Sequence, residues 1–194
     1  MTLTTEVRTD GELGRLLGAL DAVTREAREA FGRLSAAQLN WRPSAGEWGV
    51  GQCLDHLITT NRCFFPDIER VAAGAYKSSA WARVSPLSGL FGRMILKSLD
   101  PEKGRRTKAP RVFLPAPSDV PADVVERFAR HQRELAERMR ATAGADLRGT
   151  KVTSPVSALA TYSLLDAYRI VVAHERKHLE QARRVARSEG FPAA

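Results

Sequence analysis

The chain has 194 residues, 43% hydrophobic and 27% charged, which fits one soluble globular domain over 1–194 and excludes an intrinsically disordered protein. No apolar run approaches the roughly 18 residues of a membrane-spanning helix, and the first ten residues lack the apolar stretch of a secretion signal. We therefore expect a cytoplasmic protein without a membrane partner. Most of the net charge of +8 lies in 76–111, where only Asp100 and Glu102 oppose nine Lys and Arg residues.

The first part of the chain predicts two amphipathic helices. Residues 11–34 repeat apolar side chains at helical spacing. Turn residues follow, and a second helix begins near Gly49 and places His56 on its apolar face. Pro66 predicts a kink or an end of this helix.

The two cysteines, Cys53 and Cys63, lie ten positions apart on the second predicted helix. At about 1.5 Å per residue they would be about 15 Å apart, whereas a disulfide needs Cα atoms within about 7 Å. We therefore expect two free thiols in a reducing compartment.

Residues 76–120 form an elaborated connection between the second and third helices. Ser85 and Pro86 are typical of an N-cap and a first helical position, so they predict a short helix over 87–99. Residues 101–121 contain too many prolines for a regular helix and are predicted to form a loop. A connection of this length is usually functional or disordered.

Two further helices complete an all-α fold. The third is predicted over 121–143 and ends before Gly144. The fourth is predicted over 161–188, where Ser163 and Asp166 resemble a capping box. No strand-like alternation of any length stands out.

Three of the four histidines suggest a metal site. His174 and His178 are four positions apart on the fourth helix, so both imidazoles project from its apolar face about one turn apart. His56 lies on the apolar face of the second helix. Neutral imidazole is the commonest metal ligand, and three converging nitrogens would leave an open coordination position. Spacing alone also allows a hydrogen-bonded core histidine or a solvated pair, and it does not decide between these possibilities.

Other polar side chains near these histidines are interpreted as supporting or surface groups. Asp55 and Glu175 are sequence neighbours of candidate ligands, but one position on a helix turns a side chain by about 100°, so both are expected at the surface or behind the ligands. Gln181 could line the pocket or end the apolar stripe. His131 is expected at a solvated boundary of the third helix. Trp48 is expected to pack over the start of the second helix.

Three segments together resemble the DinB/YfiT-like metalloenzyme superfamily. Residues 42–57, RPSAGEWGVGQCLDHL, are similar to its tryptophan, small residue and metal-binding His at the second helix. Residues 174–185, HERKHLEQARRV, are similar to its closing motif of two His followed by Leu, Gln and an aliphatic residue. Residues 109–121 are similar to a proline-rich connection in some members. The resemblance covers nearly the whole chain, although Gly49 stands where the family often has a Ser or Thr cap.

The resemblance implies an up-down-down-up four-helix bundle that holds a divalent metal ion through His56, His174 and His178. Zinc or nickel is the expected ion, with iron or manganese as alternatives. The implied function is a metal-dependent enzyme, either a thiol-dependent transferase or a hydrolase, and no residue is assigned as general base. The expected partner is a small-molecule substrate such as a low-molecular-weight thiol. Homodimerisation through exposed helix faces is a further expectation.

A second hypothesis is a non-catalytic metal-binding or stress-response module that contacts an anionic partner through the basic segment 76–111. Its densest cations are Lys103, Arg105, Arg106, Lys108 and Arg111. Nucleic acid is disfavoured as this partner, because the cluster has no aromatic stacking platform beyond Phe113 and no recognised binding motif. A third possibility is a bundle whose three histidines bind metal for stability only.

Overall fold

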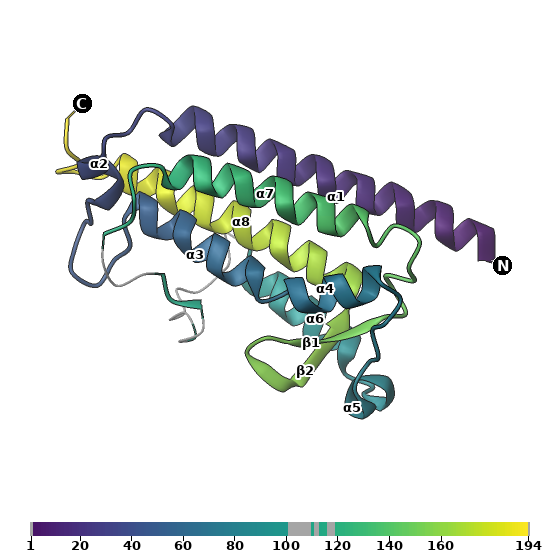
Figure 1. Ribbon diagram of the computed structural model, residues 1–194. Helices are drawn as coiled ribbons and strands as arrows, with labels where there is room; N and C mark the ends of the chain where they lie inside the picture. The colour runs from purple at the N-terminus through teal and green to yellow at the C-terminus, as the bar shows by residue number, and fades with distance from the viewer. Residues whose placement is uncertain (1, 101–109, 111–112, 116–118, 194) are drawn as a thin grey trace.

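The computed structural model of the chain describes residues 2–100, 110, 113–115 and 119–193, with side chains from residue 11 onward. These residues form eight helices and a small two-stranded sheet. Four long helices lie side by side (Figure 1): α1 (Thr2–Phe31), α3 (Val50–Arg62), α7 (Val124–Arg140) and α8 (Leu164–Ala186). The fold is therefore mostly helical, as the apolar periodicity predicts.

Four shorter helices connect the long ones: α2 (Ala36–Asn40), α4 (Phe65–Ala72), α5 (Ala80–Val84) and α6 (Ser88–Ser98). Pro66 lies in the first turn of α4, so the predicted break of the second helix is confirmed. The short helix predicted near Ser85 is present as α6 and begins at Ser88, whereas α5 was not predicted. The cations Lys103, Arg105, Arg106, Lys108 and Arg111 lie outside the described residues.

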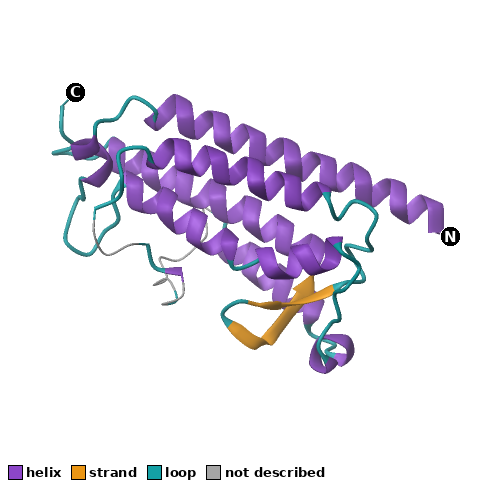
Figure 2. Ribbon diagram, in the orientation of Figure 1, coloured by secondary structure: helices purple, strands orange, loops and turns teal. Residues whose placement is uncertain are grey.

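A small antiparallel sheet shows that the all-α prediction was wrong in detail (Figure 2). Strand β1 (Lys151–Ser154) pairs with β2 (Ser157–Ser163), and the paired Val152 and Tyr162 are both buried. A four-residue strand gives too little alternation to separate it from a turn in the sequence. Residues 161–163, predicted to begin the fourth helix, belong to β2, and α8 begins at Leu164. The predicted cap is nevertheless confirmed, since Ser163 Oγ accepts a hydrogen bond of 3.0 Å from the backbone N–H of Asp166.

The core has two apolar clusters. One joins α1, α3, α7 and α8 beside the histidines and includes Leu57, Phe128 and Leu179. The other joins α1, α4, α7, the hairpin and the start of α8, and partly buried side chains of α6 pack against it. Cys53 and Cys63 are free, as predicted, and burial raises the pKa of the Cys53 thiol to about 12.

None of the helices in the described ranges is both long enough and apolar enough to cross a membrane.

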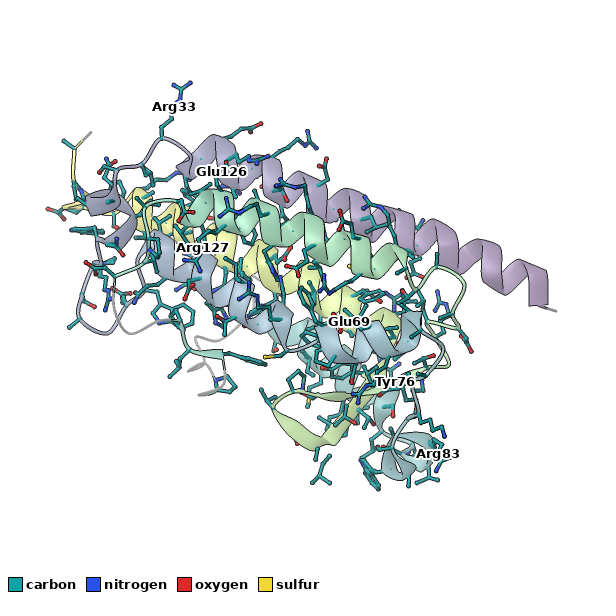
Figure 3. All side chains as sticks on the ribbon, viewed as in Figure 1. Arg33, Glu69, Tyr76, Arg83, Glu126 and Arg127 are labelled. Carbon is teal, nitrogen blue, oxygen red and sulfur yellow. The ribbon has the colours of Figure 1, made fainter. Side chains whose placement is uncertain are left out.

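His131 does not lie at a solvated boundary, because α4 covers it. The side chain is 3% exposed and stacks on Phe65, with ring centroids 5.3 Å apart. Arg138 of α7 forms an ion pair of 3.0 Å with Glu69 of α4, the residue labelled in Figure 3, and this pair joins the two helices. Burial, together with the charges of Arg62 and Arg138, lowers the pKa of His131 to about 4. The Glu134 carboxylate, 3.9 Å away, does not reverse this shift.

Changing His131 to Phe is expected to flatten the loss of stability in acid. The folded pKa lies below the unfolded value of about 6.5, so between these pH values only the unfolded chain binds the extra proton. His131 therefore removes stability as the pH falls from 6.5 toward 4, by about 1.4 kcal/mol per pH unit. Urea unfolding at a series of pH values measures this slope in both proteins. Equal slopes in the wild type and His131→Phe would rule out a buried neutral His131.

Candidate metal centre

The structure brings His56, His174 and His178 together. One ring nitrogen of each residue lies within 4.8 Å of the corresponding nitrogens of the other two. The Nε2 atoms of His56 and His174 are 3.1 Å apart. Two imidazoles on a tetrahedral zinc ion, with Zn–N distances of about 2.0–2.1 Å, place their nitrogens about 3.3 Å apart. The spacing of this pair therefore suits a shared ion.

Helix packing explains the convergence. Helices α3 and α8 pack directly against each other, and His56 lies on α3 between the buried Cys53 and Leu57. His174 and His178 are one turn apart on α8, with ring centroids 4.5 Å apart. The His56 ring lies 4.9 and 4.5 Å from these two rings, so the three imidazoles form a compact triangle.

A backbone carbonyl from the long connection sets the orientation of His56. Its Nδ1 lies 2.5 Å from the carbonyl oxygen of Phe113. In a neutral imidazole this contact requires an Nδ1–H donor, which leaves the lone pair on Nε2, the atom that faces His174. No side-chain pattern indicates this contact in advance, because every residue carries a backbone carbonyl.

All three imidazoles are held in the neutral, metal-binding form. Burial lowers the pKa of His56, lowers that of His178 to about 3 and places that of His174 well below its usual range. Repulsion between protonated imidazoles adds to the shifts of His174 and His178. The Nδ1 atom of His178 is buried and has no hydrogen-bond partner in the described part of the chain. A set of neutral nitrogens with an unpartnered buried atom fits a divalent metal ion.

One side of the cluster is covered and another is accessible. The Trp48 ring lies 4.6 Å from the His56 ring and 5.6 Å from the His178 ring, so Trp48, two residues before α3, borders the site itself. His174 and His178 are only partly buried. The Gln181 side chain lies near His178 and raises its pKa slightly against the effect of burial, which favours the interpretation that it lines the pocket.

Glu175 is completely buried, which excludes the surface position and leaves the alternative of a group behind the ligands. Asn61 Nδ2 donates a hydrogen bond of 2.8 Å to Glu175 Oε1, whereas Glu175 Oε2 and both amide atoms of the neighbouring Gln132 have no hydrogen-bond partner among the described residues. Burial raises the pKa of Glu175 to about 7. Asn61 and Gln132 were missed, although polar residues at core-facing helix positions are a signal for such a network.

The Glu175 network also bears on a possible catalytic role. Residues 174–178 have the H-E-x-x-H spacing in which a glutamate assists a zinc ion in metallopeptidases. Here the Glu175 carboxyl group is bound by Asn61 and does not belong to the three-histidine cluster. We therefore assign Glu175 to the core network and not to a general base.

A close backbone approach explains why glycine occupies position 49. A Cβ atom on Gly49 would lie 2.5 Å from the carbonyl oxygen of Trp41, so a Ser or Thr cap would collide with the backbone. The Gly49 N–H is instead bonded by Gln52 Oε1 at 3.2 Å. The departure from the usual cap is thus compatible with the same helix start.

Comparison with known proteins identifies a family for the chain. A family model described as the DinB superfamily matches residues 19–182, a range that contains all three clustered histidines. No curated protein and no solved structure matches the chain.

Proposed function

The chain belongs to the DinB superfamily, and on this basis we propose that it is a divalent-metal-dependent enzyme whose ion is held by His56, His174 and His178. The observation that carries the proposal is the convergence of three neutral imidazoles, within 4.8 Å of one another, at a partly exposed position. Three nitrogen ligands leave a position for a substrate. Zinc or nickel suits this donor set best, with iron or manganese as alternatives.

The residues around the site favour thiol transfer over hydrolysis. When bound, a divalent ion supplies Lewis acidity that favours the deprotonated form of a water or thiol. The described cluster contains no carboxylate that could act as a base, and Glu175 is engaged by Asn61. A low-molecular-weight thiol needs less help from a base than water does, because its pKa is already near 8.5. Trp48 shields one side of the site, and the partial exposure of His174 and His178 leaves an approach for a small molecule.

Adding a thiol to the cobalt- or nickel-loaded protein is expected to produce a sulfur-to-metal absorption band. Cysteine and glutathione are suitable first thiols, and their S-methyl derivatives are matched controls that cannot form a thiolate. Turnover is then followed with a chromogenic electrophile. An unchanged spectrum with every thiol tried, together with no turnover, would sink the thiol-transferase proposal.

Several finer expectations remain part of this proposal. The up-down-down-up order of α1, α3, α7 and α8 is supported by the course of the ribbon in Figure 1. A cytoplasmic location is supported by the free thiols of Cys53 and Cys63. The homodimer stays a prediction. A non-catalytic metal protein is the alternative, and it would show tight metal binding without a thiol-dependent spectrum.

A further inference from the structure

A surface away from the histidines exposes large apolar side chains. Helices α5 and α6 and the hairpin project from one side of the long helices (Figure 1). Their apolar side chains are 41–75% exposed, and together we call them the α5–α6 surface: Trp81, Val84, Leu87, Leu90, Met94 and Leu159. Single exposed apolar residues are ordinary, but a group on adjoining elements marks an interaction site.

The α5–α6 surface is the outward face of a well-anchored substructure. Ser88 and Gly92, on the inner side of α6, are buried, and Ser88 Oγ lies 2.7 Å from Thr161 Oγ1 of β2. Leu87, Leu90 and Met94 follow at spacings of three and four, which places them together on the opposite side of α6.

Helix α5 is fixed to the hairpin as well. Trp81 Nε1 donates a hydrogen bond of 2.9 Å to the Leu159 carbonyl oxygen. The Tyr76 hydroxyl, just before α5, donates to the Lys151 carbonyl at 3.1 Å, and Figure 3 shows Tyr76 and Arg83 near this end of the molecule. The apolar side chains are therefore presented on a connected frame.

The charge of these segments indicates an anionic partner. Residues 76–99 contain Lys77, Arg83, Arg93 and Lys97 but no Asp or Glu, and residues 151–163 contain Lys151 and again no acid. On α6, Arg93 and Lys97 fall beside Leu90 by helical geometry. Two copies of this surface would bring like charges together, which argues against self-association through it.

We propose that the α5–α6 surface docks peripherally on an anionic lipid bilayer. Outward apolar side chains flanked by Lys and Arg are the pattern with which helices lie in a membrane interface, where tryptophan is also favoured. A bilayer can take up separate protruding side chains because its interface has no fixed shape. A protein partner would need a groove complementary to these side chains. This proposal departs from the expectation of no membrane partner, which rested on the lack of a spanning segment. It is independent of the metal site.

Cosedimentation of the full chain with vesicles tests the proposal. We expect binding to vesicles of phosphatidylglycerol and phosphatidylcholine in equal parts, and none to phosphatidylcholine alone. Each cation near an anionic surface contributes about five-fold in partitioning, so Arg93→Gln with Lys97→Gln should weaken binding about 25-fold. Leu90→Ser with Met94→Ser should also weaken it, because insertion of the apolar stripe is lost. Arg133→Gln with Arg140→Gln, at exposed positions on α7, makes the same charge change elsewhere and should bind like the wild type.

Failure of the wild type to bind anionic vesicles would overturn the proposal, as would equal binding by the α6 and α7 charge variants. If the wild type does not bind vesicles but dimerises with rising concentration, and the Leu90→Ser, Met94→Ser variant does not dimerise, the partner of the α5–α6 surface is a second copy of the chain and not a bilayer. Metal content should be unchanged in every variant, because none touches a histidine. The membrane proposal and the metal-site proposal can therefore be contradicted independently of each other.

Discussion

Replacing His174 with Ala is expected to lower the affinity for zinc or nickel about 100-fold or more. His174 contributes one of three converging nitrogens, and its Nε2 lies 3.1 Å from that of His56. Even residues that only orient a metal ligand are worth about 10–100-fold in affinity, so loss of a ligand should cost at least the upper end of that range. Competition against a chromophoric chelator measures the change.

Arg176→Ala is the matched control for this experiment. Arg176 lies on α8 between the two histidines and is exposed, so its replacement alters the same helix without removing a nitrogen. The control should keep wild-type affinity. Wild-type affinity in His174→Ala as well would show that the three histidines do not form the binding site.

Removing the metal with a chelator is expected to lower the Tm by about 8–16 °C relative to protein with excess metal. A ligand that binds only the folded state at 1,000 times its Kd stabilises it by about 4 kcal/mol. For a domain of this size, each kcal/mol corresponds to about 2–4 °C. The ion would tie α3 to α8 through His56 and His178, which unfolding separates. Differential scanning calorimetry measures the shift.

The same scan on His174→Ala separates site binding from general effects of the metal. The variant should show little difference between chelated and metal-supplemented samples. An equal Tm for the wild type under both conditions, or an equal shift in the variant, would contradict stabilisation through this site.

Periodic patterns predicted the helical framework and the placement of His174 and His178 on one helix face. His174 and His178 could be placed on one face because helical geometry alone relates positions four apart. That His56 meets them depends on the packing of α3 against α8, which the family resemblance implied and the helix pattern alone left open. The free thiols likewise followed from spacing on one helix.

The sequence patterns did not predict burial or contacts that depend on residues distant in the sequence. His131 has polar neighbours in the sequence, but its burial depends on α4 folding back over α7. The 100° turn between helix neighbours could not decide whether Glu175 lies at the surface or behind the ligands, because its burial depends on Asn61 of α3 packing against α8. Backbone contacts, such as that of the Phe113 carbonyl with His56, leave no mark in side-chain patterns.

X-ray absorption at the metal edge of tag-free protein, reconstituted with one equivalent of zinc in thiol-free buffer, tests the three-histidine site most directly. We predict a first shell with three imidazole nitrogens at about 2.0–2.1 Å, recognisable by the outer-shell scattering of histidine rings. The same spectrum should contain no sulfur, because Cys53 is buried and uncharged. A sulfur shell near 2.3 Å, or a shell without histidine scattering, would contradict the site.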